Sequence, residues 1–168
     1  VVNTYSKEDL IRILRDYGEE KFAPRIASAI VEAREKKPVE TTFELVDLIK
    51  QALPMAAKRA KGHPAKQTFQ AIRIEVNHEL DYLKECIEGS FARLNVGGRF
   101  CIITFHSLED RIVKQMFHSF TIGCTCPPEF PVCVCGKTPR AKLVPKKPIE
   151  PTLEEIEQNN RSRSAKLR

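Results

Sequence analysis

One short polar stretch of this sequence contains the residue types that an active site needs. It reads TFHSLEDR at residues 104–111 and overlaps the end of an apolar run at residues 100–105. A nearly unbroken apolar run of this length is typical of a strand buried on both faces at the centre of a parallel sheet. Ligands of such sheets bind beyond the carboxyl ends of the strands, so residues 104–111 are the best-placed polar cluster in the chain.

The same residues have a simpler interpretation. Ser107 can cap a following helix, whose first turn would carry Glu109 and Asp110 at the positive end of the helix dipole. His106 would then be an ordinary turn residue. Capping sequences are commoner than active sites, so the local pattern alone favours this second interpretation.

A second group of reactive side chains consists of two C-x-C segments on either side of a proline-rich stretch. Four thiolates brought together in this way can hold zinc tetrahedrally, although structural zinc sites more often have two residues between paired cysteines. Free thiols in a mobile loop are an equal alternative, and a reducing cytosol argues against disulfides. The predicted metal ligands are Cys124, Cys126, Cys133 and Cys135, whereas Cys86 and Cys101 are expected to be small core residues.

The charge of the chain permits a polyanionic partner without requiring one. It carries 28 Lys and Arg against 22 Asp and Glu among 168 residues, a net charge of +6. No apolar run approaches the roughly 20 residues that span a bilayer, and no signal-peptide pattern is visible, so a cytoplasmic protein is expected. Two basic clusters are equally well explained as solvated surface or as RNA contacts: Lys58, Arg59, Lys61, His63 and Lys66, and Arg161, Arg163, Lys166 and Arg168.

Apolar periodicity and capping residues predict the elements that must position these groups. Three short amphipathic helices are expected within residues 7–53, followed by a basic connector and a single apolar stripe from residue 68 to the glycines at 97 and 98. Four further elements complete the pattern: the strand at 100–105, a helix to about residue 120, a brief strand at 142–144 and a helix at 153–158. The sequence starts without methionine and stops in a basic run, so we expect a segment of a longer protein.

Four motifs spread along the chain carry a resemblance to a known family. They are YGEEKFAPRIASAIVEAR at residues 17–34, TFQAIRIEVNHE at 68–79, GGRFCIITFHSLEDRIVK at 97–114 and RSRSAKLR at 161–168. On these motifs the chain resembles the C-terminal portion of the bacterial ribosomal RNA small subunit methyltransferase H family, also called the MraW family.

The resemblance implies an α/β fold and an enzymatic function. The family uses S-adenosylmethionine to methylate the N4 amine of a cytidine in 16S ribosomal RNA, and its Rossmann-like sheet is interrupted by an inserted all-helical domain. Residues 1–74 would form most of the insert. Residues 75–168 would form the C-terminal half of the methyltransferase domain, with a cysteine-rich loop at 124–136. The implied partner is 16S ribosomal RNA or the small ribosomal subunit, no membrane is expected, and a homodimer is an open alternative.

Position and chemistry suggest roles for particular residues within this framework. We expect the catalytic residues, lining the nucleotide side of the cleft, to be Thr104, Phe105, His106 and Ser107, with Glu109, Asp110 and Arg111 as an alternative group that fixes the loop by ion pairs. The expected RNA-binding residues are Lys58, Arg59, Lys61, Arg73, Asn77, Arg161 and Arg163. No cofactor-binding residue is expected, because the family's glycine-rich cofactor loop precedes the start of this chain, and the segment alone is expected to be inactive.

Two alternatives from other functional classes remain open at this point. The first is a non-catalytic RNA-binding module with a zinc-binding cysteine loop, which would bind RNA with a steep salt dependence and no cofactor effect. The second is a structural domain stabilised by zinc, which would unfold when the metal is chelated.

Overall fold

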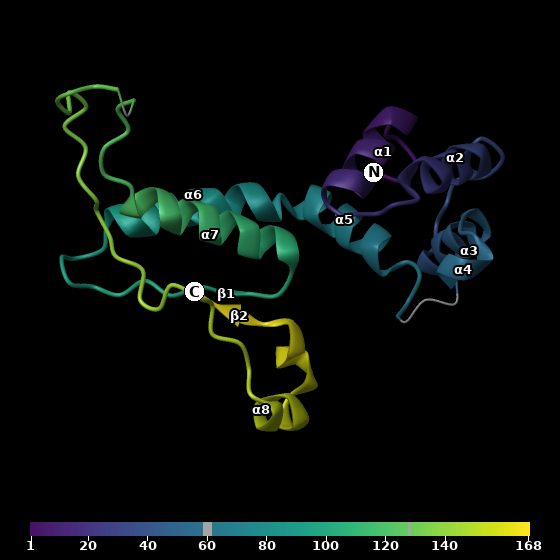
Figure 1. The fold of residues 1–168 in the computed structure, drawn as a ribbon. Coiled ribbons are helices and arrows are strands. Elements are labelled where there is room, and N and C mark those ends of the chain that lie inside the picture. Colours follow the sequence, from purple (N-terminus) through teal and green to yellow (C-terminus); the bar gives the residue numbers. More distant parts are fainter. Residues whose placement is uncertain (59–61, 128) are drawn as a thin grey trace. The chain divides into compact units, whose positions relative to one another are not determined.

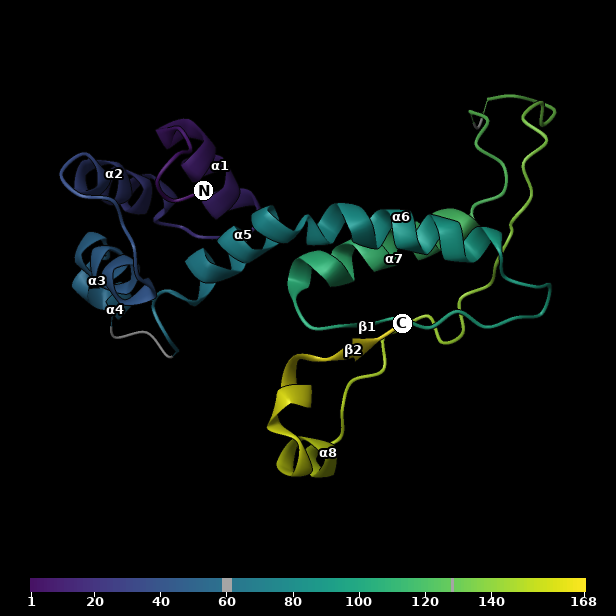
Figure 2. The same ribbon diagram turned by 180° about the vertical axis from the view of Figure 1, so that it is seen from behind.

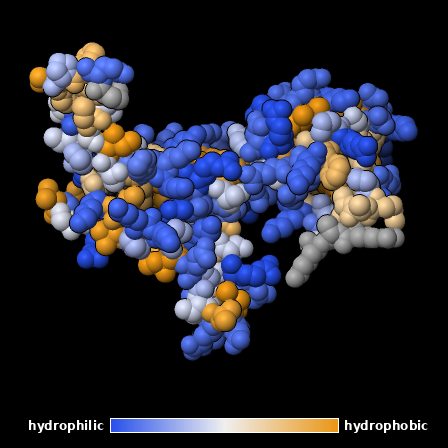
Figure 3. Space-filling view, viewed as in Figure 1, coloured by the Kyte–Doolittle hydropathy of each residue, from blue (hydrophilic) through white to orange (hydrophobic). Residues whose placement is uncertain are grey.

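The computed structural model describes residues 1–58, 62–127 and 129–168. By their internal contacts these residues form two compact units, Val1–Glu79 and Leu80–Arg168. Both units are largely helical, and the strands of the described part are short (Figures 1 and 2). The face seen in Figure 3 is mainly hydrophilic with small apolar patches, and no helix in the described part is long and apolar enough to cross a membrane.

The N-terminal unit confirms the three short amphipathic helices predicted from the sequence. Ser6 caps the first helix by accepting a hydrogen bond from the Asp9 N–H at 3.0 Å, and Thr41 forms a reciprocal capping box with Glu44 before the third. The apolar faces of the helices meet in one core that includes Leu10, Ile13, Ile26, Ile30 and Ile49. The helices of this unit are α1 (Lys7–Asp16), α2 (Ala23–Arg34), α3 (Thr42–Ala52), α4 (Met55–Lys58) and α5 (Lys66–Asn77).

The prediction of one uninterrupted helical stripe after residue 68 is wrong. His78 adopts the left-handed conformation with φ 51° and ψ 35°, which ends α5, and α6 begins at once and spans Glu79–Ala92. The backbone N–H of His78 donates to the Ile74 carbonyl, closing the last turn of α5. A single left-handed residue leaves the apolar periodicity on both sides intact, so the pattern gives no warning of the break.

The C-terminal unit is built on two packed helices, α6 and α7 (Ser107–Thr121), which lie side by side in both ribbon views (Figures 1 and 2). Their shared core contains Ile87, Val113, Phe117 and Phe120. The rings of Phe91 and Phe120 stack with centroids 3.8 Å apart and planes 6° apart. The predicted helix running to about residue 120 is therefore confirmed.

The predicted central strand is wrong in its length and burial. Only Ile103–Thr104 forms a strand, β1, and it pairs antiparallel with β2 (Lys166–Leu167). Ile103 is 58% exposed, and within the described residues β1 has a strand neighbour on one edge only. The chain is thus mostly helical with a small two-stranded sheet in its described part, and the parallel Rossmann-like sheet remains a prediction.

Other predictions for this unit have mixed outcomes. No strand forms at residues 142–144, where Leu143 instead packs against the core of α6 and α7. Cys86 and Cys101 are both exposed, so their assignment to the core is wrong. Helix α8 (Leu153–Gln158) is confirmed, with Thr152 accepting from the Glu155 N–H at 3.2 Å, and the short 3₁₀ helix η1 (Asn160–Ser164) follows.

An ion pair fastens the end of the chain to the start of α7. Arg168 donates from Nε to Asp110 Oδ1 at 2.6 Å and from Nη2 to Oδ2 at 3.0 Å. Both side chains are more than four-fifths buried, with 13% and 15% of their surfaces exposed. The Arg168 backbone also exchanges both hydrogen bonds with Ile102, at 2.8 and 2.9 Å. We call this arrangement the Asp110–Arg168 clasp; it fixes β1 and the turn after it.

We predict that Gly18→Ala destabilises the N-terminal unit. A Cβ at Gly18 would lie 2.6 Å from the Leu14 carbonyl oxygen and 2.8 Å from that of Gln67, both fixed backbone atoms. Thermal or urea unfolding should show a loss of about 2 kcal/mol. The matched control is Gly89→Ala, where the added Cβ meets only the flexible Arg93 side chain at 3.5 Å, and a gain of up to about 1 kcal/mol is expected. Equal effects of the two substitutions would contradict the close approach of the chain at Gly18.

We predict that Asp110→Asn lowers the free energy of unfolding by about 2 kcal/mol near neutral pH, because it removes a charge-assisted bidentate pair. Hydrogen bonds from Arg168 lower the pKa of Asp110 below its ordinary value of 3.8. A carboxyl whose pKa is lower in the folded than in the unfolded chain stabilises the fold at any pH above its unfolded-state pKa. This stabilisation is lost as the pH falls through its folded-state pKa.

The difference between the wild-type chain and Asp110→Asn should therefore be constant from neutral pH to about pH 5 and shrink below about pH 4. Asp81→Asn is the control, since Asp81 pairs with Lys84 at 3.8 Å with both side chains more than half exposed. It should change stability by less than about 0.5 kcal/mol. A pH-independent difference at Asp110 would show that the charge of the clasp is not the stabilising element.

Candidate functional site

The polar stretch at residues 104–111, which we call the polar turn, begins at a buried residue. Thr104 is 2% exposed, and its hydroxyl donates to the Lys166 carbonyl of β2 at 3.3 Å. This bond gives the Thr104 side chain a structural role, joining the two strands above the Asp110–Arg168 clasp. Phe105 follows with 55% of its surface exposed, so its ring is available for contact.

His106, and not Ser107, caps α7, which corrects the simpler interpretation of the sequence. His106 Nδ1 accepts from the backbone N–H of Glu109 at 3.4 Å. The Glu109 carboxylate returns the interaction by accepting from the backbone N–H groups of Phe105 and His106, at 2.8 and 3.2 Å. Ser107 is then the first helical residue, and it is exposed. The capping box is the one expected of Ser or Thr, shifted by one residue.

The electrostatics of the turn centre on His106 and Glu109. Burial alone raises the pKa of Glu109, but the adjacent His106 side chain and the Phe105 N–H outweigh it and hold the pKa below its usual 4.5. His106 Nε2 lies 3.3 Å from Glu109 Oε1, yet it has no partner of hydrogen-bond geometry among the described residues. Because Nδ1 is an acceptor, a neutral His106 carries its proton on Nε2.

The predicted RNA-binding residues belong to both units. Lys58 ends α4 and is exposed, whereas Arg59 and Lys61 lie outside the described residues. Arg161 and Arg163 are both exposed on η1, on either side of the buried Ser162.

Arg73 and Asn77 are held by one carboxylate. Glu79 accepts from Arg73 Nε at 2.8 Å and Nη2 at 3.0 Å, and from Asn77 Nδ2 at 3.1 Å. Arg73 remains 55% exposed, but this pairing neutralises its charge. The assignment of both residues to RNA stays a prediction.

A cavity of about 760 Å³ in the C-terminal unit was not predicted from the sequence. The Arg140 guanidinium lies 5.1 Å from the ring centre of Phe91 and 5.2 Å from that of Phe120, a double cation–π contact at the wall. The described residues that line the cavity include no Asp or Glu, and its cations include Arg99, Lys114, Arg140, Lys142, Lys146 and Lys147. Four of these fall within residues 140–147, a local basic density that would have marked the segment.

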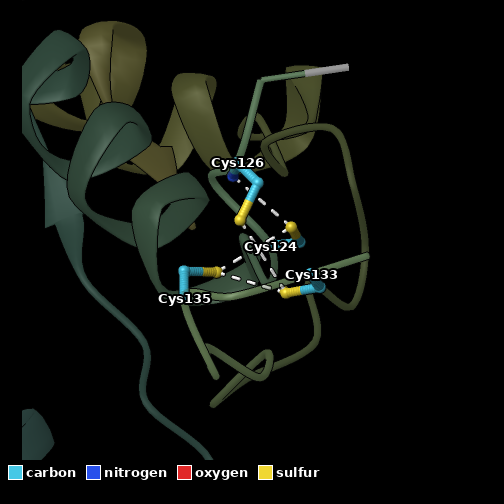
Figure 4. A group of neighbouring side chains, drawn as sticks. All are labelled: Cys124, Cys126, Cys133 and Cys135. Carbon is cyan, nitrogen blue, oxygen red and sulfur yellow. Dashed lines mark hydrogen bonds between the residues drawn. The ribbon is translucent and has the colours of Figure 1, made fainter. Parts of the chain in front are cut away.

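The structure brings the four predicted metal ligands together. In Figure 4 their side chains point toward one another, and any two of the four sulfurs lie within 4.8 Å. Backbone N–H groups of Thr125 and Lys137 lower the pKa of the Cys135 thiol to about 5, which favours its thiolate form. Each of the four cysteines is free of disulfide bonds.

Comparison with known proteins places the chain in a family. A family model described as the MraW methylase family matches residues 1–168. A protein named Ribosomal RNA small subunit methyltransferase H from Clostridium botulinum is 61% identical, and one of the same name from Ruminiclostridium cellulolyticum is 60% identical, each over 168 residues. The relative of that name from Brevibacillus brevis is 54% identical.

These alignments cover all of the chain and 54% of each relative, so the chain spans about half the length of the curated relatives that it matches. The match is continuous through the helices of the first unit, the turn at 104–111 and the basic C-terminal motif. Because the family model covers every residue, the chain belongs to the MraW methylase family.

Proposed function

We propose that the complete protein transfers a methyl group from S-adenosylmethionine to the N4 amine of a cytidine in 16S ribosomal RNA, and that it does so in the cytoplasm. The observation that carries the proposal is the match of the whole chain to the MraW methylase family. The names of the relatives support a ribosomal RNA substrate. The nucleotide and the methyl donor follow from the family resemblance of the motifs.

We assign no residue of this chain to the cofactor. S-adenosylmethionine supplies an electrophilic methyl group on sulfur, and its binding fold needs a glycine-rich turn directly after a strand. Gly97 and Gly98 precede β1 instead. A Cβ at Gly98 would lie 2.9 Å from the Leu94 side chain, so the space beside this glycine is already filled by the chain itself.

The contribution that we propose for this chain is to hold the target base. An enzyme that modifies an exocyclic amine must take the base out of its stack and orient it, and positioning supplies much of the rate. The exposed ring of Phe105 offers a stacking surface, and the exposed Ser107 hydroxyl can accept from an amine. His106 and Glu109 fix the backbone between these two side chains.

A second contribution is contact with the RNA backbone. The cavity cations have no carboxylate among their described neighbours on the cavity wall, so their field is uncompensated there. Phosphate groups are the complementary ligands, and aromatic side chains beside the cations suit unpaired bases. Arg161 and Arg163 extend the candidate interface.

The alternative of a non-catalytic RNA-binding module is less favoured. The relatives are named as methyltransferases, and they match this chain along its full length. A metal in the cysteine loop is compatible with either function and therefore does not discriminate between them.

We predict that the complete protein, incubated with S-adenosylmethionine and small ribosomal subunits, produces N4-methylcytidine in 16S RNA, detected by mass spectrometry of nucleosides. Phe105→Leu should slow this reaction about tenfold, because it removes base stacking worth about 1 to 3 kcal/mol. Phe105→Tyr keeps the ring and should stay near the wild-type rate. Absence of methylated cytidine from the folded wild-type protein would contradict the proposed function, and a wild-type rate for Phe105→Leu would contradict the stacking role.

We also predict that Lys146→Gln with Lys147→Gln weakens binding of 16S RNA fragments and lowers the salt dependence. Two lost phosphate contacts should reduce the slope of log K against log salt by about 1.5. Both lysines are exposed and lie outside the helices and strands, so the fold should be unaffected. The control is Lys50→Gln with Lys84→Gln, two exposed helix lysines outside the cavity. An equal change in slope for both pairs would show that the cavity cations have no special role.

A further inference from the structure

The loop between α7 and the segment at 137–147 gathers four thiols, and none of its described apolar side chains is buried. Figure 4 shows the side chains of Cys124, Cys126, Cys133 and Cys135 converging from two C-x-C turns. The sulfurs lie 4.0 Å apart for Cys126 and Cys133, 3.5 Å apart for Cys133 and Cys135, and 3.8 Å apart for Cys135 and Cys124. The convergence joins the two ends of the loop.

These distances match the edges of a metal–thiolate tetrahedron. Zinc–sulfur bonds of about 2.3 Å at tetrahedral angles place the sulfurs about 3.8 Å apart. Disulfide-bonded sulfurs lie about 2.05 Å apart, so the cysteines of the loop are not arranged as two disulfides. The sulfurs of Cys133 and Cys135 lie 3.5 Å apart, so a single residue between two cysteines in the sequence allows their sulfurs to approach to about the length of one tetrahedron edge.

Backbone donors support negative charge on the sulfurs. The N–H of Cys126 donates to Cys124 Sγ at 3.4 Å, and the N–H of Thr125 donates to Cys135 Sγ at 3.5 Å. A zinc ion with four thiolates carries two net negative charges, and hydrogen bonds to the ligand sulfurs offset part of that charge. The turn around Thr125 therefore serves one sulfur from each C-x-C segment.

The loop needs a device other than packing to stay ordered. Phe130, Val132 and Val134 are 51%, 70% and 73% exposed, so its apolar side chains stabilise little. Ordering each residue costs about 1 to 2 kcal/mol in backbone entropy, which apolar contacts do not offset here. Metal binding can supply such a stabilisation, because the binding free energy of a structural site becomes folding free energy.

We propose that Cys124, Cys126, Cys133 and Cys135 bind one zinc ion as a closed, structural four-thiolate site. Four protein ligands leave no open coordination position, so the site orders the loop and does not activate water. Each thiol that is protonated releases its proton on binding. The site is independent of the proposed methyltransferase function, since none of these sulfurs belongs to the polar turn.

The test is the metal content of the complete protein, purified under reducing conditions without added metal chelators. Elemental mass spectrometry should find about one zinc per chain. Replacement of zinc by Co²⁺ should give thiolate-to-cobalt absorption in the near ultraviolet and the visible bands of tetrahedral cobalt. Cys124→Ser with Cys135→Ser should lose the metal, whereas Cys86→Ser with Cys101→Ser, exposed cysteines outside the loop, should retain it.

Limited proteolysis keeps the test decisive if the cysteine variant fails to fold. Trypsin cleavage of the wild-type protein after Lys137 and Arg140 should accelerate about tenfold when a chelator removes the metal, and zinc should restore protection. The proposal is overturned by wild-type protein that holds no zinc and shows no tetrahedral cobalt spectrum. It is also overturned if Cys86→Ser with Cys101→Ser removes the metal as completely as the loop variant does.

Discussion

The Asp110–Arg168 clasp is the interaction on which the rest of the C-terminal unit depends. It joins the first turn of α7 to the end of the chain, and the backbone pairing of Arg168 with Ile102 carries that connection to β1. The strands β1 and β2 contain only two residues each, and so short a ribbon is marginal by itself in water. The bidentate, largely buried ion pair between Asp110 and Arg168 fixes the register in which β1 pairs with β2. It thereby also fixes the position at which the polar turn starts.

Hydrogen bonds fix the backbone of the polar turn, and two of its residues, Phe105 and Ser107, are exposed. The Glu109 carboxylate accepts from two successive backbone N–H groups, and His106 Nδ1 accepts from the backbone N–H of Glu109. These bonds use the His106 and Glu109 side chains for positioning and leave Phe105 and Ser107 on the surface. A fixed backbone with an exposed ring and hydroxyl is the arrangement that base recognition requires, and it is why we propose that this chain holds the target base.

Local signals in the sequence predict the helices well and the long-range pairing poorly. Ser6, Thr41 and Thr152 each cap the helix that their position predicts. The break at His78 is invisible, because one left-handed residue without glycine does not disturb the apolar period. The pairing of β1 with β2 is also invisible, because a partner more than 60 residues away in sequence, such as Lys166 for Thr104, leaves no local signal.

The candidate site also has parts that the sequence predicts and parts that only the fold brings together. The turn at 104–107 and the four loop cysteines are predictable, because each is a compact sequence motif. Arg99, Lys114 and Arg140 meet around one cavity from three segments, so only the fold brings them together. The capping role of His106 also depends on geometry, since histidine is not among the common N-cap residues.

The central claim is that this chain holds the RNA side of a methyltransferase whose cofactor site is formed by other residues of the complete protein. Calorimetric titration of S-adenosylmethionine into the complete protein and into the 168-residue chain tests it directly, with circular dichroism to show that both are folded. The account predicts saturable heat with the complete protein and none with the chain. Saturable binding by the chain, with an affinity equal to that of the complete protein, would contradict it.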